Sequence, residues 1–340
     1  MKKKIIPLLA ACAVILVLGI ALAALTMLGG EEEEDTGIPL CTIAVDSVDH
    51  ISYDDGENAQ SLTKDGDGNW TLDSDPLLPI SKNQAEAVAE DITSLEAQRI
   101  MTDDAEVDAM GFDDPEMILT ITAGDETFTV TVGAQNTMTD TYYVRTSTDD
   151  TVYTVSVSEL SSVCKSPENL YEPQRMIDLA SDDVATMTVR TGSEELNFTQ
   201  TDGTWTLTDD PTYELDQDLV SRMASTICEM SSSWSITAPE ADSVYGLDAP
   251  NTVVTVVGTD GSSVTCSFGS NDPADDGLCY LRSSNAEGVV YEVNSGHLTA
   301  YAYTKDTLKA ATPETAEDDG ETDDTTADYP VGGADTVTSE

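Results

Sequence analysis

The hydrophobic pattern is clearest over 127–132, where threonines at the odd positions alternate with a phenylalanine and two valines at the even positions. A period of two predicts a strand of an antiparallel sheet with one buried face. Gly133 follows and is expected to end this strand. Shorter segments of β type, separated by turns rich in Asp and Gly, occupy 48–53, 60–64, 70–72, 142–145 and 152–155.

One segment between these strands has a helical period. Ser81 is a suitable N-cap, and an apolar stripe follows it. The stripe consists of Ala85, Val88, Ala89, Ile92 and Leu95. We therefore predict a helix that begins near Ser81 and packs this stripe on the sheet. A second, short helix is expected from Ser158.

The whole pattern occurs twice. The segment 70–72, Trp-Thr-Leu, returns at 205–207, and the Gly-Φ-Asp-x-Pro element at 111–115 returns at 246–250, both at an offset of 135 residues. The second copy predicts strands at 186–190, 195–200 and 205–207, and a strand that ends at Gly269. Its helix is expected from Asp216, with a buried face formed by Leu219, Met223, Ile227 and Met230. Because solenoid units run only ~20–50 residues, this period indicates a small domain copied in tandem.

The order of strands, helix and strands indicates the α+β class. We expect two tandem homologous domains, each an antiparallel β meander, a helix and a further antiparallel strand group, after one N-terminal transmembrane helix. The expected boundaries are a cytoplasmic stub and transmembrane anchor over 1–30, an acidic spacer over 31–47, the first repeat domain over 48–173, a linker over 174–183, the second repeat domain over 184–308 and a disordered acidic tail over 309–340.

The anchor is expected from an uncharged apolar run over 5–28 that follows three lysines. As a helix it would be about 36 Å long, enough to cross a hydrocarbon core of ~30 Å. The lysines on one side and the acidic run 31–35 on the other place the N-terminus in the cytoplasm and the bulk of the chain outside it, as a single-pass protein of the cell membrane. A cleaved signal peptide and a lipoprotein processing box at Cys12 are the alternatives.

The net charge of −51 changes the list of partners. A surface of this sign repels phosphate backbones, so nucleic-acid binding is not expected. The charge indicates a solubilising surface, or alternatively a surface that recruits cations or a basic partner.

The residues suited to catalysis or metal binding form no known motif. His50 and His297 are the two histidines, and neither has a histidine at the matching place in the other copy. The run Asp65-Gly66-Asp67-Gly68-Asn69 begins like a calcium loop, but Trp70 and Pro76 occupy positions that need Gly and Glu, so a hairpin turn is expected. We predict no catalytic residue, no metal site and no cofactor.

Other repeated residues have structural and functional interpretations. Trp70 and Trp205 are expected in the core with a paired indole N–H, rather than on a sugar-binding platform. Arg145 and Arg282 recur after a tyrosine and an aliphatic residue, and either pair with nearby carboxylates or contact a partner. In the Gly-Φ-Asp-x-Pro element, Gly allows a positive φ, Asp caps and Pro leads into the next strand.

The cysteines follow no shared framework. Cys266 and Cys279 lie on consecutive expected strands and could form a disulfide in an oxidising compartment.

Taken together, these landmarks resemble the bacterial domain-of-unknown-function family 4340. The resemblance rests on the Asp-Gly-x-Trp-Thr-Leu hairpins at 67–72 and 202–207, the Tyr-Gly-Leu-x-x-Pro element at 245–250 with its altered copy at 110–115, and the paired strands at 142–145 with 152–155 and at 280–282 with 290–293. It implies a membrane-anchored protein that accompanies ABC-type transporters of the gliding-motility kind, and it carries over no catalytic residue.

We therefore expect a membrane-anchored extracytoplasmic interaction module without catalytic activity. Its partner would be an integral membrane protein such as an ABC-type permease. The alternative is a cell-surface protein that binds or hydrolyses wall polymer or peptide.

Overall fold

A computed structural model describes residues 37–101, 107 and 109–311. The expected anchor, most of the expected spacer and most of the expected tail lie outside these residues. Within the described ranges, no helix is both long and apolar enough to cross a lipid bilayer.

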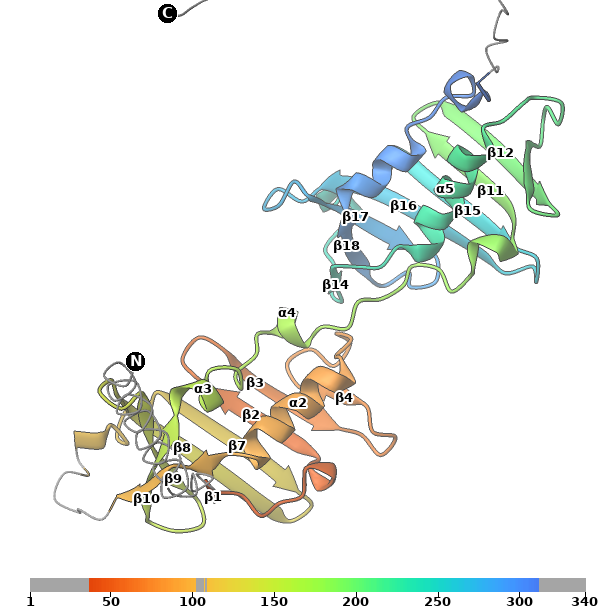
Figure 1. Ribbon diagram of the computed structural model, residues 1–340. Coiled ribbons are helices and arrows are strands. Elements are labelled where there is room, and N and C mark those ends of the chain that lie inside the picture. The colour runs from red at the N-terminus through yellow and green to blue at the C-terminus, as the bar shows by residue number, and fades with distance from the viewer. Residues whose placement is uncertain (1–36, 102–106, 108, 312–340) are drawn as a thin grey trace, which may run out of the picture.

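The described chain forms two eight-stranded antiparallel sheets of the same topology (Figure 1). The strand order is β4-β3-β2-β7-β8-β9-β10-β6 in the first sheet and β13-β12-β11-β15-β16-β17-β18-β14 in the second. One α-helix crosses a face of each sheet, α2 (Lys82–Thr93) in the first domain and α5 (Gln217–Glu229) in the second. Two tandem domains of the α+β class are therefore confirmed.

The first sheet consists of β2 (His50–Asp54), β3 (Ala59–Lys64), β4 (Trp70–Leu72), β6 (Arg99–Met101), β7 (Met117–Ala123), β8 (Glu126–Asn136), β9 (Thr141–Thr146) and β10 (Val152–Ser156). Shorter elements of this domain are β1 (Ile38–Pro39), η1 (Val45–Ser47), β5 (Glu96–Ala97), α3 (Val157–Leu160) and α4 (Pro167–Leu170).

The second sheet consists of β11 (Val184–Thr191), β12 (Glu194–Thr201), β13 (Thr204–Leu207), β14 (Trp234–Ile236), β15 (Thr252–Gly258), β16 (Ser263–Asn271), β17 (Leu278–Ser283) and β18 (Val290–Asn294). Its shorter elements are η3 (Ser181–Asp183), η4 (Asp242–Val244), η5 (Ser295–Tyr301) and η6 (Asp306–Leu308).

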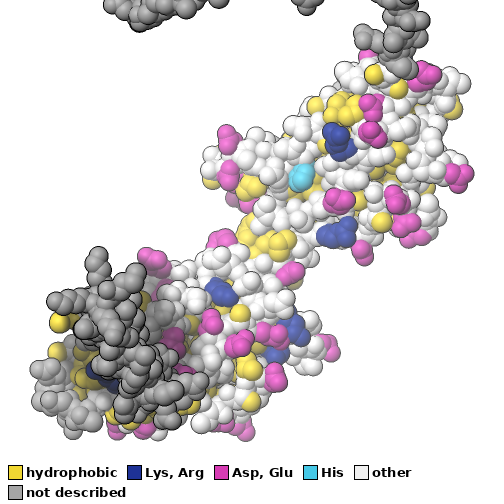
Figure 2. Space-filling view, in the orientation of Figure 1, with side chains coloured by type: hydrophobic (Ala, Val, Ile, Leu, Met, Phe, Trp, Pro, Cys, Tyr) yellow, Lys and Arg dark blue, Asp and Glu magenta, His cyan; other side chains and the backbone are white. Residues whose placement is uncertain are grey.

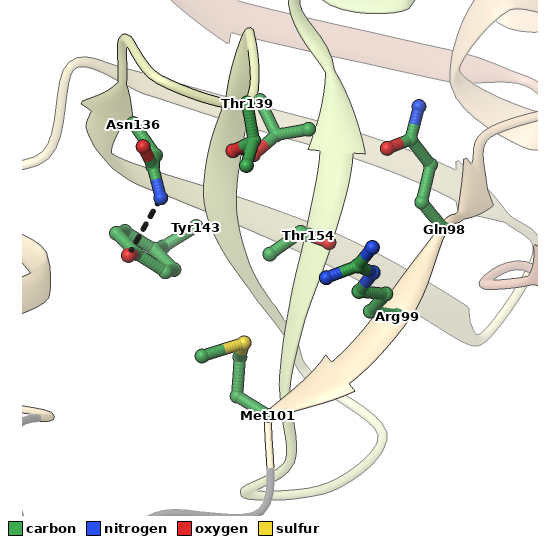
Figure 3. A pocket seen from close by; sticks show the side chains of 8 residues that line it. Gln98, Arg99, Met101, Asn136, Thr139, Tyr143 and Thr154 are labelled. Carbon is green, nitrogen blue, oxygen red and sulfur yellow. Dashed lines mark hydrogen bonds between the residues drawn. The ribbon is translucent and has the colours of Figure 1, made fainter.

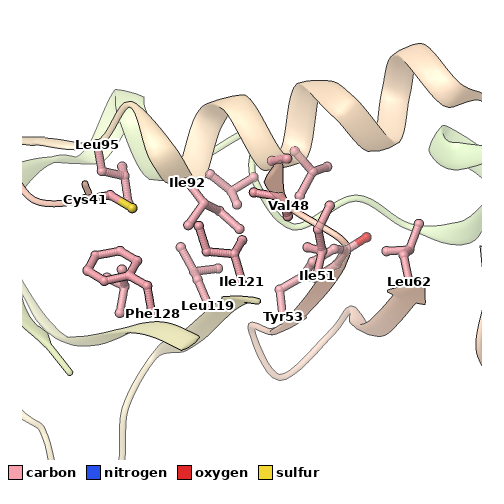
Figure 4. Close-up of a cluster of buried hydrophobic side chains, with 14 of the residues drawn as sticks. Cys41, Val48, Ile51, Tyr53, Leu62, Ile92, Leu95, Leu119, Ile121 and Phe128 are labelled. Atoms are coloured by element: carbon pink, nitrogen blue, oxygen red, sulfur yellow. The ribbon is translucent and has the colours of Figure 1, made fainter. Parts of the chain in front are cut away.

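The core of each domain lies between its helix and its sheet. All five residues of the stripe predicted for α2 are buried. Figure 4 shows Ile92 and Leu95 above the sheet, facing Ile121, Leu119 and Phe128. Burial of such side chains stabilises the fold by about 1.5–3 kcal/mol each. In α5 the buried face differs slightly from the prediction, because Val220 is fully buried whereas Leu219 is only partly buried.

The opposite face of each sheet, which we call the open face, is polar. The alternation predicted in β8 is confirmed, with Phe128, Val130 and Val132 buried. The threonines on the other side pair across strands, and Thr120 Oγ1 lies 3.1 Å from Thr129 Oγ1. The matching pair in the second domain, Thr255 and Thr265, is 2.9 Å apart.

Gly133 does not end its strand as expected. β8 continues to Asn136, with a register shift between Val132 and Gln135 where it pairs with β9. The same irregularity follows Phe268 in β16. A bulge of this kind bends the strand without terminating it.

The described part of the acidic spacer expected over 31–47 belongs to the first domain. β1 pairs with β5, and Leu40, Cys41 and Ile43 are buried in the first core. The sequence analysis missed these apolar residues because the segment is acidic as a whole. At the other end, Lys309 forms a bridge with Leu215, so the second domain extends at least to this residue.

The linker expected over 174–183 is likewise part of a domain. Met176 and Ile177 are buried in the second core. Just before them, the Tyr171 hydroxyl lies 2.5 Å from Ser232 Oγ and 2.7 Å from Ser235 Oγ. The two domains are therefore joined by buried contacts and not by a free tether.

The helix N-termini differ between the copies. Asp216 Oδ1 accepts hydrogen bonds from the backbone N–H groups of Asp218 and Leu219. Ser81 has the extended backbone of an N-cap, but its side chain makes no capping bond. The side-chain cap expected at Ser81 is therefore not formed, whereas Asp216 caps the second helix.

Candidate functional site

The repeated Gly-Φ-Asp-x-Pro element packs against the bulge of the neighbouring strand. Gly111 and Gly246 have φ values of +82° and +69°. A Cβ on Gly133 would lie 2.1 Å from the Met110 carbonyl oxygen, and one on Gly269 would lie 2.1 Å from the Tyr245 carbonyl oxygen. We call each of these backbone approaches a glycine contact. No side chain fits there, so the shared glycines serve packing.

The aspartates of this element do not cap as predicted. Among the described residues, neither Asp113 nor Asp248 accepts a hydrogen bond through its carboxylate. In the second copy the turn is closed by the Leu247 N–H, which donates to the Asp242 carbonyl.

Both repeated tryptophans are core residues, as predicted. Trp70 is 3% exposed and Trp205 is 1% exposed. The Trp205 indole N–H lies 3.3 Å from the Gln200 side-chain oxygen when that amide donates to the Val184 carbonyl. The Trp70 indole N–H, however, is buried without a hydrogen-bond partner in the described part of the chain, so the expected pairing is wrong for this copy.

The run that begins like a calcium loop is a hairpin turn. Asp65 Oδ1 accepts hydrogen bonds from the backbone N–H groups of Asp67 and Asn69 at 2.9 and 2.8 Å. The carboxylate therefore closes its own turn. Across the described ranges, no cluster of His, Cys, Asp and Glu is suited to hold a metal ion.

The two repeated arginines make different contacts. Arg282 Nη1 lies 2.6 Å from Asp242 Oδ1, which is the carboxylate pairing expected for this residue. The Arg145 guanidinium lies 4.3 Å from the centre of the Phe112 ring, a cation–π contact. Each arginine thus holds the turn next to a glycine contact.

One His-Ser-Asp cluster lies on the open face of the first sheet. His50 Nε2 is 3.0 Å from Ser61 Oγ, and Ser61 Oγ donates to Asp73 Oδ2 at 2.5 Å. Partial burial opposes ionisation of Asp73, but the hydroxyl bonds from Ser61 and Thr63 outweigh it and lower the pKa of this carboxyl.

This cluster lacks the geometry of a catalytic triad. In a triad the acid orients the histidine nitrogen that does not face the serine. Here Asp73 binds the serine itself, and its Oδ2 is 3.6 Å from the same Nε2 that faces Ser61. The serine proton is therefore directed to a carboxylate whose lowered pKa makes it a weak base. The hairpin register places Thr186 at the position of His50 in the second copy.

His297 and the cysteines show no catalytic arrangement. His297 lies in η5, where burial lowers its pKa, and the described residues place no hydrogen-bond partner on its ring. Cys266 and Cys279 are buried free thiols, so the disulfide that the sequence left open is not formed in this structure. The register explains this, because Cys266 faces Ser283 whereas Cys279 faces Asn271.

A hollow of about 300 Å³ lies on the open face of the first sheet, near its β6 edge. It is lined by Gln98, Arg99, Met101, Asn136, Thr139, Thr141, Tyr143 and Thr154. Figure 3 shows the Arg99 guanidinium beside Thr154, across the hollow from Tyr143 and Asn136, whose amide donates to the Tyr143 hydroxyl at 3.3 Å. Among the described lining residues Arg99 is the only charged one, and its charge is opposite to that of the protein.

Both domains have three neighbouring side chains on adjacent strands at this place, which we call the cross-strand row, but their chemistry differs. Tyr143, Thr154 and Arg99 are neighbours on β9, β10 and β6. The row at this place in the second sheet consists of Tyr280, Glu292 and Trp234.

Negative groups surround the row of the second domain. Tyr280 donates to Asp272 at 3.1 Å. Burial raises the pKa of Glu292, and the Asp272 and Asp275 carboxylates add to this effect. The two copies therefore differ in charge at this row. Sequence analysis missed it, although Arg99 and Trp234 are separated by the repeat offset of 135 residues.

Comparisons with known proteins give a family but no function. The family described as "Domain of unknown function (DUF4340)" matches residues 70–206 and 205–315. Each match begins at a repeated Trp-Thr-Leu strand. Neither the curated proteins nor the solved structures contain a match. Because the two matches cover well over half of the chain, this protein belongs to the DUF4340 family, with two consecutive copies of its unit.

Proposed function

We propose that this protein is a membrane-anchored, extracytoplasmic interaction module without catalytic activity, accessory to an ABC-type transporter complex. The proposal rests on one observation: the residues that both copies share have structural roles, and they form no shared site. Residues repeated in both copies, such as Gly133 and Gly269 or Trp70 and Trp205, serve packing. The polar groups repeated with them include the threonine pairs of the open faces, whereas the His50–Ser61–Asp73 cluster has no counterpart in the described part of the second copy.

The surface chemistry supports binding to a protein partner. The open faces carry threonine pairs that already satisfy one another's hydrogen bonds. Figure 2 shows acidic side chains spread over both domains on the helix side, with few Lys or Arg among them. The net charge of −51 repels anionic lipid headgroups and nucleic acid, so a protein is the partner that we propose for the open faces.

The anchor and the transporter role are inferred from the sequence. The apolar run over 5–28 and the charges that flank it support a single-pass anchor with the domains on the outer side. The partner is then an integral membrane protein, with an ABC-type permease as the specific expectation.

Cross-linking in the native cell tests the proposal. A tagged full-length chain would be cross-linked and purified, and its partners identified by mass spectrometry. We expect an integral membrane protein, with permease subunits of an ABC transporter enriched over an anchored control carrying unrelated domains. Recovery of no membrane protein above that control would refute the proposal.

The alternative function is binding or hydrolysis of wall polymer or peptide. The observation that favours binding is the polar His50–Ser61–Asp73 cluster, which occurs in the first copy only, although it lacks the geometry of a hydrolytic triad. Replacement of His50 by alanine decides between the two functions. Loss of wall binding or hydrolysis in this variant, with complex formation intact, would support the alternative.

A further inference from the structure

The segment 171–176, through which the chain enters the second domain, covers one end of the cross-strand row of that domain. The Tyr171 ring packs on Trp234, with ring centres 5.1 Å apart. From Tyr171 the chain runs through a bridge between Arg175 and Ser231 to Met176, whose N–H donates to the Met230 carbonyl at 3.1 Å.

The first domain is entered in the same way. The Leu40 N–H donates to the Leu95 carbonyl at 3.0 Å, and Pro39 pairs with Glu96. These contacts match those of Met176 and Arg175 at an offset of 136 residues. At that offset, the residue equivalent to Tyr171 is Asp35.

The residues at the two equivalent positions differ together between the copies. Trp234, which receives the Tyr171 ring, is replaced in the first domain by Arg99. The segment that would reach Arg99 is the acidic run 31–35, four glutamates followed by Asp35. An aromatic pair in one copy thus corresponds to a carboxylate and a guanidinium in the other.

From this correspondence we infer that the acidic run 31–35 binds in the Arg99 hollow of the first domain. The guanidinium of Arg99 pairs with a carboxylate of the run, and the Gln98 and Asn136 amides and the Thr154 hydroxyl are the neutral polar groups around it. The contact needs no membrane, so it is independent of the proposed transporter role.

The contact has a consequence for the anchored protein. Only seven residues separate Gly30 from β1, and such a segment spans at most about 25 Å. This consequence, unlike the contact itself, rests on the proposed anchor: with the run bound at Arg99, the first domain would be held close to the end of the apolar segment, with its β6 edge toward it.

Disulfide trapping in the full-length chain tests the position of the run. In a Cys12→Ser background, Asp35→Cys is combined with Arg99→Cys, and the control pair combines it with Ile100→Cys, the next residue of β6, whose exposed side chain lies on the opposite face of the sheet. The pair Tyr171→Cys and Trp234→Cys is the positive control from the second domain.

We expect the Asp35–Arg99 pair to form a disulfide at least about tenfold faster than the control pair, because docking raises the effective concentration of the two thiols. A rate within twofold of the control would overturn the inference.

A charge test covers the case in which cysteine at position 99 disturbs the edge strand. In the full-length chain, a Glu-specific protease would cut after the glutamates of 31–34, and mass spectrometry would measure the rate at these sites. Arg99→Glu should speed cleavage there by about fivefold, and salt should have the same effect on the unaltered chain. Arg99→Lys should retain part of the protection. Equal rates for the unaltered chain and Arg99→Glu would contradict the inference.

Discussion

The substitution Gly269→Ala tests the role of the glycine contacts. The new Cβ would lie 2.1 Å from the Tyr245 carbonyl oxygen and 3.2 Å from Leu247 Cγ. The first of these neighbours is backbone, so a change of side-chain rotamer cannot relieve the overlap. The turn that carries Tyr245 must instead move away from β16 by about 1 Å to restore an ordinary contact.

The expected loss in the free energy of unfolding of the second domain is about 3 kcal/mol. Overpacking of a tight site costs roughly 1–3 kcal/mol. The displacement also weakens the 2.8 Å hydrogen bond from the Ser270 N–H to the Tyr245 carbonyl, which contributes about 1 kcal/mol. Gly288→Ala is the matched control, because a Cβ there meets no atom within 4 Å, and it should change stability by less than about 0.5 kcal/mol.

Hydrogen exchange at increasing denaturant, read by mass spectrometry on the full-length chain, gives this free energy for each domain separately. Peptides from β16 and β17 should lose protection in Gly269→Ala, whereas peptides from β8 should not. If Gly269→Ala and Gly288→Ala had equal effects, the assignment of the repeated glycines to packing would be wrong.

Three further predictions concern other sites. Tyr171→Phe removes bonds to two buried serine hydroxyls, so it should cost about 1–2 kcal/mol and raise hydrogen exchange at the domain joint, with Tyr213→Phe as the control of the same chemistry. Glu292→Gln should raise the melting temperature at pH 7 and leave it unchanged well below pH 4.5. The pKa of Glu292 is raised in the folded state, so the unaltered protein loses stability as the pH rises above the unfolded pKa of 4.5, and the glutamine variant does not. An effect of the same size at both pH values would contradict that reasoning. A reductant should not shift the melting temperature, and iodoacetamide should label Cys266 and Cys279 only after unfolding, because burial raises their thiol pKa values to about 12 and about 11.

Local periodicity was sufficient to predict most of the fold. The stripe of α2 and the alternation in β8 follow from the geometry of a helix and a strand, and both faces are buried as expected. Segments whose burial depends on a distant partner were missed. Leu40 and Ile43 are surrounded by acidic and polar residues in the sequence, and only their contact with the first core reveals their role.

The candidate site depends on register, which periodicity does not give. Arg99 becomes a neighbour of Thr154 and Tyr143 only when three strands align. The cluster of His50, Ser61 and Asp73 likewise requires the pairing of β2 with β3 and of β3 with β4. The repeat offset could have indicated the difference between Arg99 and Trp234, but it could not show that both lie at the end of one row.

The glycine contacts illustrate the same limit. Sequence analysis predicted a turn with a positive φ at Gly246, and the structure confirms it. It also predicted that Gly269 ends a strand, whereas this glycine allows the turn to approach the strand. A close contact between two backbone segments that are distant in the sequence produces no periodic pattern of residues.

Photo-cross-linking in the native cell tests the central claim most directly, that the open faces bind a membrane partner while the repeated residues hold the scaffold. A photoreactive amino acid would replace Thr129 or Thr265 on the open faces, and Asn83 or Arg222 on the solvent side of the helices would serve as controls. We predict cross-links to an integral membrane protein from at least one open face and none from the helix positions. Equal cross-linking from all four positions, or a wall polymer as the only product, would contradict the account.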